Sequence, residues 1–291
     1  MTDTINETLI ENRTYDAERS LYHLQNAEVR SCTFAGEADG ESVLKEGRHI
    51  TVSDCRFSLR YPLWHVEDYR LLRSTMDEKT RAPIWYAFDG HIEDCEIRSV
   101  KALRECQRTT VINSRVTSTE FGWRCRELTL IDSSFESEYF LFEAAALRAD
   151  NLTLKGKYSF QYVKDAVIKN SYLDTKDAFW HAENVLVENS VVKGEYLGWF
   201  SRGLTFKNCR IIGTQPLCYC KDLTLIDCTM EETDLSFEYS EVQASVIGPI
   251  LSVKNPEKGE IVADGFGEVI FEDSIMESTC TVKTREDVLS F

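Results

Sequence analysis

Long apolar runs and positive charge are both scarce in this 291-residue sequence. No stretch of 18 apolar residues occurs, and no basic segment followed by an apolar one opens the chain, so a membrane-spanning helix and a secretion signal are both missing. The chain has 33 Lys and Arg against 49 Asp and Glu, a formal charge of −16. Such a surface repels phosphate, so neither nucleic acid nor an anionic membrane is an expected partner. We expect a soluble, acidic, cytoplasmic protein.

Glycine and proline are also few, at 14 and 5 residues. Phosphate loops, dinucleotide fingerprints, nucleophile elbows, EF-hands and metalloprotease motifs are all missing. We therefore expect no cofactor and no metal, and the missing motifs favour a protein that is not an enzyme. The ten Cys residues are expected to be reduced and buried in a chain without a secretion signal, although copies such as Cys209 and Cys228 would lie near disulfide distance. Cys218 and Cys220 alone are too few ligands for zinc.

The sequence does contain an internal repeat of about 19 residues. Its template alternates apolar and other residues, continues with Asn or Asp and then Cys or Ser, and ends two positions later on an apolar residue, as in Leu204–Ile211 (LTFKNCRI) and Leu223–Met230 (LTLIDCTM). The small residue recurs in steps of 19, once doubled to 38, at Cys95, Ser114, Ser133, Ser171, Ser190, Cys209 and Cys228. Looser copies place it at Cys32, Cys55, Thr75, Ser245 and Ser274.

This repeat predicts an all-β fold. The period-2 alternation indicates short strands, and a coil of 19 to 20 residues suits a right-handed parallel β-helix. Leucine-rich repeats have a similar length, but their leucine pattern and helical half are missing. We expect one domain, residues 1–291, with about eleven coils. Residues 1–20 form an N-terminal cap, 21–234 the regular coils, and 235–291 irregular last coils with a C-terminal cap.

In a β-helix each template position becomes a column along the axis. One predicted column holds the turn residues Asp54, Asp94, Asn113, Asp132, Asn170, Asn189, Asn208, Asp227 and Asp273. The small Cys and Ser residues fill the adjacent inward column. A third ladder is mostly aromatic, with Trp64, Trp85, Leu103, Trp123, Phe142, Tyr162, Trp180, Trp199 and Tyr219. We expect the tryptophans to face the core; the alternative is an outward, flat platform for sugars.

Three stretches resemble a bacterial family of proteins, formed by a domain of unknown function of about this length. They are Ala17–Leu21 (AERSL), Gly40–Glu46 (GESVLKE) and Ser252–Val269 (SVKNPEKGEIVADGFGEV). The resemblance extends over nearly the whole chain and implies the pectin-lyase-like right-handed β-helix fold. It implies no activity and no catalytic residues.

Two histidines are each followed two positions later by a glutamate, as His65-x-Glu67 and His181-x-Glu183. On a strand such residues share a face, so each pair could be a general base with its carboxylate or part of a metal site. Solvated surface pairs are the favoured interpretation.

The positions after the ladder residues predict a surface stripe of His65, Tyr86, Arg104, Arg124, Glu143, Val163, His181, Phe200 and Cys220. Arg124, Glu143 and His181 are the candidate catalytic residues. Candidate substrate-binding residues are Tyr139, Asp177, Glu183, His65 and Glu67. An Arg, a carboxylate and aromatic rings together suit a sugar chain.

The sequence thus favours a non-enzymatic structural or binding module, with its partner and oligomeric state left open. The alternative is a carbohydrate-binding protein or a carbohydrate-active enzyme of the lyase or hydrolase type, working on one strand face.

Overall fold

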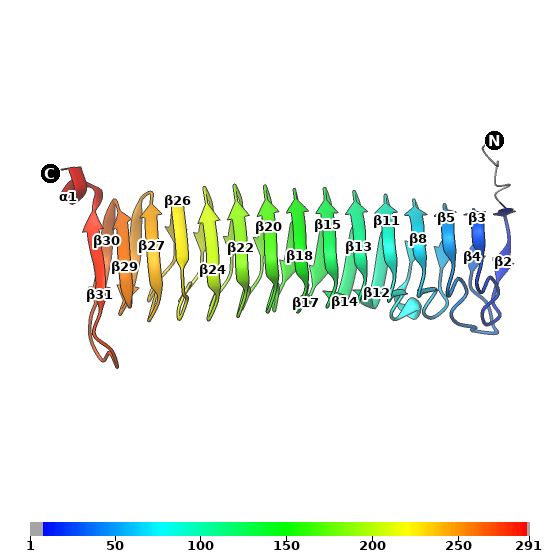
Figure 1. Cartoon of the computed structure of the whole chain (residues 1–291), viewed down its shortest axis with the longest axis horizontal. Helices are drawn as coiled ribbons and strands as arrows, with labels where there is room; N and C mark the ends of the chain where they lie inside the picture. The colour runs from blue at the N-terminus through cyan, green and yellow to red at the C-terminus, as the bar shows by residue number, and fades with distance from the viewer. Residues whose placement is uncertain (1–7, 290–291) are drawn as a thin grey trace, which may run out of the picture. The chain divides into compact units, whose positions relative to one another are not determined.

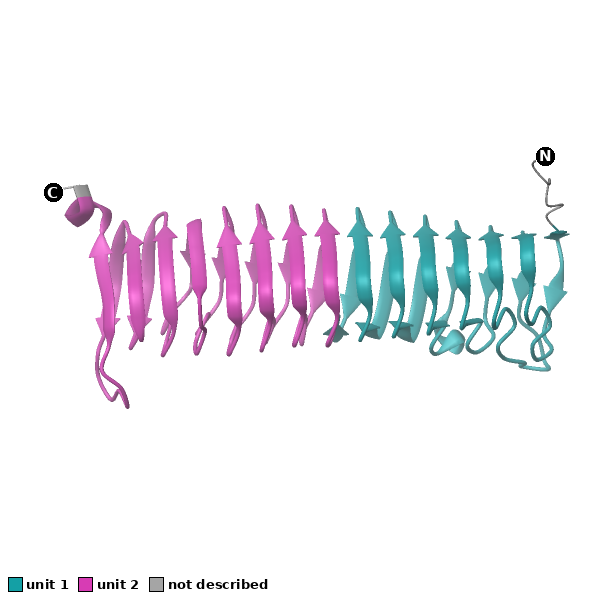
Figure 2. Cartoon of the chain, viewed as in Figure 1, with its two compact units in different colours: residues 1–141 teal, residues 142–291 magenta. Residues whose placement is uncertain are grey.

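The computed structural model describes residues 8–289, and these form a parallel β-helix (Figure 1). The chain divides into two compact units, residues 1–141 and 142–291 (Figure 2). In each unit, a long parallel sheet runs along one side and short strands form the opposite side and corners. In Figure 1 the labelled long strands lie toward the viewer and point upward, and the coils of each unit advance from right to left, which makes each coil right-handed. The predicted fold is confirmed.

Unit 1 stacks seven strands in its long sheet. They are β1 (Thr8–Glu11), β3 (Gln25–Arg30), β5 (Arg48–Ser53), β8 (Glu67–Leu72), β11 (Phe88–Glu93), β13 (Gln107–Ile112) and β15 (Arg126–Ile131). The remaining elements are β2 (Thr14–Tyr15), β4 (Thr33–Phe34), β6 (Arg56–Phe57), β7 (Leu63–Trp64), β9 (Thr75–Met76), η1 (Glu78–Thr80), β10 (Ile84–Trp85), β12 (Glu96–Arg104), β14 (Arg115–Trp123), β16 (Ser134–Ser137) and β17 (Tyr139–Phe140). The step between coils varies here, since Ala27 pairs with Ile50 and Ile50 with Tyr69.

Unit 2 stacks eight strands in its long sheet. They are β18 (Ala145–Asp150), β20 (Lys164–Lys169), β22 (Glu183–Glu188), β24 (Arg202–Lys207), β26 (Leu223–Glu231), β27 (Glu241–Val246), β29 (Lys258–Ala263) and β31 (Thr279–Thr284). The others are β19 (Thr153–Gly156), β21 (Tyr172–Asp174), β23 (Val191–Lys193), β25 (Arg210–Ile212), β28 (Pro249–Lys254), β30 (Gly265–Ile270) and α1 (Arg285–Leu289). The first coils repeat every 19 residues, as Ala166 pairs with Val185 and Val185 with Leu204.

The expected number of coils is wrong. Seven and eight long strands give the described residues about 15 turns instead of eleven. The count from the sequence is too low because the repeat template is incomplete at both ends of the chain and in two internal copies. Ser74 rather than Thr75 occupies the small-residue column, and Val246 rather than Ser245 pairs with Cys228 after a register shift. Ser274 lies in the segment between β30 and β31, outside any strand.

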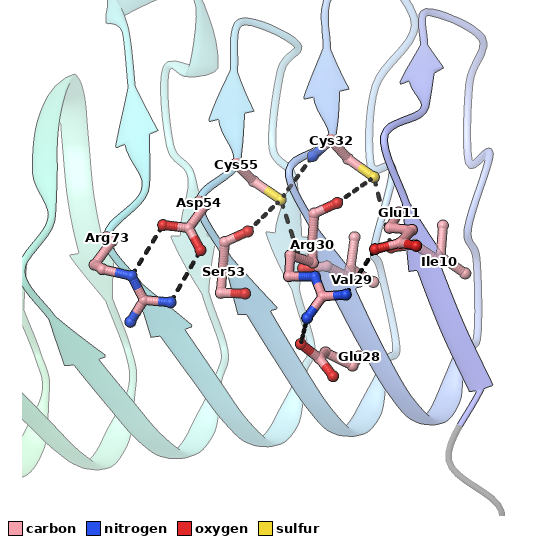
Figure 3. A network of polar contacts seen from close by, with 10 residues as sticks. All are labelled: Ile10, Glu11, Glu28, Val29, Arg30, Cys32, Ser53, Asp54, Cys55 and Arg73. Atoms are coloured by element: carbon pink, nitrogen blue, oxygen red, sulfur yellow. Dashed lines mark hydrogen bonds and ion pairs between the residues drawn. The ribbon is translucent and has the colours of Figure 1, made fainter.

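The predicted turn column is confirmed for eight of its nine residues, and its backbone explains its composition. Asp273 lies in the segment between β30 and β31 and is not part of the column. All nine predicted Asn and Asp residues adopt left-handed conformations, with φ between 44° and 55°. Asn and Asp tolerate this region better than other side-chain-bearing residues. Their side chains also join neighbouring coils: Asn113 donates to Asp94 at 2.6 Å, and Asn208 to Asn189 at 3.3 Å. In Figure 3, Arg73 bridges both carboxylate oxygens of Asp54 at 2.9 Å.

The small residues next to this column form a ladder of hydrogen bonds. The backbone N–H of Ser114 donates to Ser133 Oγ at 3.1 Å, and that of Ser171 donates to Ser190 Oγ at 3.0 Å. Cysteine takes the same place: the N–H of Cys32 donates to Cys55 Sγ at 3.4 Å (Figure 3). Ser and Cys interchange here because each is small and carries an acceptor atom aimed at the next coil.

The core of each unit lies between its sheets and contains stacked phenylalanines. In unit 1, Phe34 stacks on Phe57 with ring centroids 4.5 Å apart; in unit 2, Phe160 stacks on Phe179 at 4.8 Å. All four rings are fully buried. Neither η1 nor α1, the helices of the described chain, is long and apolar enough to cross a membrane.

Candidate functional site

The candidate residues are divided between the two units. His65, Glu67, Arg124 and Tyr139 belong to unit 1, and Glu143, Asp177, His181 and Glu183 belong to unit 2. The three candidate catalytic residues Arg124, Glu143 and His181 all adopt left-handed turn conformations, with φ of 54° or 55°. Tyr139 packs edge-on against Trp123, whose indole N–H donates to the Tyr139 carbonyl at 3.2 Å.

The two His-x-Glu pairs do not share a strand face, so that expectation is wrong. His65 and His181 are left-handed corner residues, whereas Glu67 and Glu183 begin the following strands β8 and β22. A left-handed residue breaks the alternation that would align positions i and i+2. The glutamates instead pair with neighbouring coils: Glu67 lies 3.5 Å from Arg48, and Glu183 lies 3.0 Å from Lys164.

His181 belongs to a column of stacked aromatic rings on the surface of unit 2. Its ring lies between those of Tyr162 and Phe200, with centroid distances of 4.8 and 5.1 Å and interplanar angles of 12°. The column continues from Phe200 to Tyr219 at 4.9 Å and from Tyr219 to Tyr239 at 5.7 Å. Tyr162 is 43% exposed and Phe200 44%. We call Tyr162, His181, Phe200, Tyr219 and Tyr239 the aromatic column.

Sequence analysis finds this column only in part. It assigns Val163 and Cys220 to the surface stripe, but both side chains are buried, and the neighbouring residues Tyr162 and Tyr219 hold the surface positions. The error is one residue in each case. All five column residues have φ between 53° and 61°, so the column follows the left-handed corner, which the aromatic spacing alone does not reveal.

The tryptophans form a second, half-buried layer. Among the described residues none of the five lies in the buried core, so the favoured inward interpretation is wrong. Trp180 stacks on Trp199 at 5.5 Å with an interplanar angle of 4°, and their N–H groups donate to the carbonyls of Tyr196 and Gln215. These bonds hold the indoles against the corner, where only part of each ring remains in contact with water.

In unit 1 the corresponding layer contains an arginine, Arg104, where the sequence analysis places Leu103. Backbone register aligns Arg104 with Trp85 and Trp123, and its guanidinium lies 5.2 and 5.1 Å from their ring centroids. Glu120 accepts a hydrogen bond from it at 2.8 Å, and both side chains are mostly buried. Arg104 is therefore a structural cation enclosed by aromatic rings, and not a member of the surface stripe.

A groove of about 500 Å³ opens on unit 2 beside the tryptophan layer. Consecutive coils align Thr175, Gly194 and Gly213 at one corner. A Cβ on Gly194 would lie 1.5 Å from the Thr175 carbonyl oxygen, and one on Gly213 would lie 2.2 Å from that of Gly194, so only glycine fits. Glycine thus lets the coils approach closely at this corner of the groove, which Lys176, Glu195 and Glu232 border.

Aromatic contacts connect the groove to the column. Lys176 Nζ lies 5.2 Å from the ring centroid of Tyr196, which packs edge-on against Trp199 at 5.4 Å. Trp199 in turn contacts Tyr219 at 5.5 Å. A series of side-chain contacts therefore links the rim of the groove to the aromatic column.

Asp177 follows directly after the groove residue Lys176. Its carboxyl is nearly buried, and this burial raises its pKa, against the opposing influence of Lys176 and Lys157. A carboxyl with a raised pKa beside a groove is a common property of general acids.

All ten cysteines are free thiols, and nine of them are buried. Burial raises the pKa of Cys218 to about 12 and that of Cys220 to about 11, which keeps both protonated and poor as metal ligands at neutral pH. Among residues 8–289, no group of three His, Cys, Asp or Glu side chains is arranged to hold a metal ion.

A family model described as "Protein of unknown function (DUF3737)" matches residues 8–283. No curated protein matches the chain. Among solved structures, PfbA, a surface adhesin of Streptococcus pneumoniae, matches with a TM-score of 0.52 at 8% identity, covering 81% of this chain and 86% of that one. The Azotobacter vinelandii mannuronan C-5 epimerase AlgE6 A-module covers 96% and 90%, at 12% identity and a TM-score of 0.33. The tailspike protein gp49 of Pseudomonas phage LKA1 covers 95% and 46%, at 10% identity and a TM-score of 0.32. At these identities only the fold of the adhesin is informative, and it agrees with the β-helix.

Proposed function

This chain belongs to the DUF3737 family of proteins of unknown function, and we propose that it is a non-enzymatic binding module whose ligand lies along the aromatic column of unit 2. The observation that carries the proposal is the column itself, five consecutive coils with an aromatic side chain at the same surface corner. Exposed aromatic surface is costly in water unless a partner covers it. We place the protein in the cytoplasm, because ten free thiols suit a reducing compartment.

The geometry of the stack supports a ligand that extends along it. Parallel rings in contact lie roughly 3.5 Å apart, so the observed centroid distances of 4.8 to 5.1 Å mean that successive rings are displaced sideways. The stacked rings still keep a large part of their surface in water, 43% for Tyr162 and 44% for Phe200. The column therefore repeats an apolar surface once per coil, which suits a polymer with regularly spaced apolar faces. A sugar chain has this character.

The charges around the column support binding over catalysis. Glu183 pairs with Lys164, Lys176 with Glu195, and Glu188 with both Lys169 and Lys207 at 2.9 to 3.0 Å. Cross-strand pairs of this kind stabilise a parallel sheet and occupy the carboxylates that an acid–base mechanism would need. His181 is likewise occupied, because both faces of its ring contact other rings.

A carbohydrate-active enzyme is the second candidate, and Asp177 favours it. Its raised pKa and its position next in sequence to the groove residue Lys176 suit a general acid acting on a glycan. In this alternative Asp177 would work with Glu143, His181 and Glu183 of unit 2.

One experiment tests both candidates. Neutral and acidic oligosaccharides are screened against the whole protein by thermal shift, and each ligand found is titrated by calorimetry. We expect Phe200→Ala to weaken binding about fivefold, because an aromatic contact contributes on the order of 1 kcal/mol. Ile226→Ala is the matched control: Ile226 is 39% exposed on the same unit but lies outside the column.

The outcomes separate the candidates. An equal loss of affinity in both variants would show that the column is not the binding surface. Mass spectrometry of the incubated sugars decides the second question, because shortened or unsaturated products would replace the binding module by the enzyme. No shift with any sugar would refute a carbohydrate ligand.

A further inference from the structure

Within residues 8–289, Asp177 is the only charged residue that is buried, with 8% of its surface exposed. Its backbone is bonded on both sides: its N–H donates to the Glu195 carbonyl at 2.9 Å, and its carbonyl accepts from Gln161 Nε2 at 2.9 Å. Its carboxylate receives no hydrogen bond and no ion pair from any residue that the structure describes. Buried carboxylates are almost always paired, so the state of this one calls for an explanation.

A second carboxylate of unit 2 shows how the fold accommodates a partly buried charge. Glu188, whose side chain is 16% exposed, lies 3.0 Å from Lys169 on one adjacent coil and 2.9 Å from Lys207 on the other. Two lysines thus neutralise a group that is less buried than Asp177. The same alternation of charges between coils would neutralise Asp177, but the chain does not provide it there.

The lysines nearest to Asp177 make other contacts. Lys176 Nζ lies 2.7 Å from Glu195 and 5.2 Å from the ring centroid of Tyr196. Lys157 Nζ lies 4.5 Å from the centroid of the tyrosine ring that follows it in sequence. Both lysines attract the carboxylate at longer range, yet burial outweighs them and raises its pKa. An uncompensated buried charge destabilises a fold, and such groups are typical of binding sites.

Tyr196 stands beside Asp177 on the next coil. The hydrogen bond from the Asp177 N–H to the Glu195 carbonyl aligns the two residues, and both have left-handed backbones, with φ of 51° and 56°. Their side chains therefore leave the corner at equivalent positions. The ring of Tyr196 already lies against a cation, the ammonium of Lys176. An aromatic ring next to a carboxylate attracts positive charge, since both present negative potential to it.

The carboxylate is in contact with the surface. In the described chain, the side-chain atoms that are both fully enclosed and unpartnered belong to other residues, so the unpartnered oxygens of Asp177 keep some contact with water. Lys176 and Glu195, which directly precede Asp177 and Tyr196, line the groove of unit 2. A small ligand at this margin of the groove can therefore replace the water at the carboxylate.

We propose that the Asp177 carboxylate binds the primary ammonium group of a small organic amine, with the ring of Tyr196 beside it. The proposal is independent of the ligand of the aromatic column. A primary ammonium fits because its N–H groups donate to both unpartnered oxygens while its charge compensates the carboxylate. The formal charge of −16 on the chain also attracts cations toward the site. Amino sugars and aliphatic diamines both carry this group.

Calorimetric titration of the whole protein tests the proposal, with glucosamine and putrescine as the amines and the ionic strength held constant with sodium chloride. We expect at least one amine to bind, and the comparison of the two identifies the source of the ammonium group. N-acetylglucosamine keeps the sugar and loses the charge, and choline keeps the charge and loses the N–H donors. We expect neither of these to bind as tightly as the amine.

The variants locate the site. We expect Asp177→Asn to weaken binding of the amine roughly tenfold or more, because a hydrogen bond between charged groups is lost. Asp222→Asn is the matched control, since it removes the same charge from a left-handed corner residue whose side chain is 70% exposed. Thermal unfolding gives a second readout: saturating amine should raise the Tm of the wild type and of Asp222→Asn, but not that of Asp177→Asn.

Four results would overturn the proposal. One is that neither amine binds the wild type. Another is an equal loss of affinity in Asp177→Asn and Asp222→Asn, which would assign binding to the general negative charge of the surface. Equal binding of N-acetylglucosamine and glucosamine would assign it to sugar hydroxyls. Equal binding of choline and the amines would show that the site recognises charge without hydrogen bonds to the carboxylate.

Discussion

Individual residues in left-handed conformation place the surface side chains of this protein. The column residues Tyr162, His181 and Phe200 all have φ near 55° to 61°, as do the corner residues around them. For residues without a short polar side chain, this conformation is unfavourable in free energy. Ring stacking between coils offsets part of that cost, because each pair contributes roughly 0.5–1.5 kcal/mol. The stacking contacts that stabilise these left-handed corners therefore also hold the rings at the surface.

Asp177 tests the link between burial and stability at one residue. Burial raises the pKa of its carboxyl, so the folded protein favours the neutral form more than the unfolded chain does. The ionised group therefore destabilises the fold above the raised pKa, and this penalty disappears once the pH falls below about 4, where both states are protonated. We expect Asp177→Asn to raise the Tm at pH 7 and to leave it unchanged at pH 3, measured by thermal unfolding followed by circular dichroism.

Asp222→Asn is the control for this prediction. Asp222 also has a left-handed backbone, but its side chain is 70% exposed. The substitution preserves shape and conformational preference without relieving a buried charge. A similar rise in both variants would assign the effect to Asn in the left-handed turn instead of to burial.

At the scale of a coil, the Ser and Cys ladder closes the backbone at each bend. The N–H of Ser171 is buried and donates to Ser190 Oγ, which itself donates to the Glu188 carbonyl at 2.8 Å. Ser190→Ala leaves the Ser171 N–H without its acceptor, and an unsatisfied buried donor costs about 1–3 kcal/mol. We expect that loss in the free energy of unfolding measured with denaturant.

Ser190→Cys is the matched variant, since cysteine occupies the equivalent place at Cys55 and accepts the N–H of Cys32. It should recover most of the stability lost in Ser190→Ala. If both variants lost stability equally, the ladder would depend on hydroxyl geometry rather than on any acceptor of this size.

The columns inside the coils could be predicted from the sequence more accurately than the side chains on the surface. The Asn and Asp column and the inward small residues follow from a template repeated at fixed spacing, and each unit has both. Val163, Cys220 and Leu103 were assigned to the wrong columns by one residue, because alternation cannot be counted through a left-handed corner. The groove was not predictable, since the need for glycine at Gly194 and Gly213 comes from carbonyl oxygens of the neighbouring coil, which the sequence alone does not locate.

At the scale of the whole molecule, a solenoid should tolerate the loss of one complete coil. Each coil contacts its neighbours alone, so stability is approximately a sum of local terms. In unit 2, Tyr172 pairs with Val191 and Val191 with Arg210, so deleting residues 172–190 joins Ser171 to the residue equivalent to Tyr172. Inward residues stay inward, and Cys209 takes the place of Ser190 below Ser171. We expect a cooperatively unfolding β protein whose Tm lies within a few degrees of the original.

Deleting residues 172–189, one fewer, is the informative comparison. The shift by one position turns the buried Val192 outward and the neighbouring side chains inward in the strand that follows the junction, because side chains alternate with period 2. We expect that variant to lose its β-sheet circular dichroism signal or to aggregate, while the 19-residue deletion remains soluble and folded. Equal stability of the two deletions would mean that the coils are not in strict register, and equal failure would mean that stability is not local to neighbouring coils.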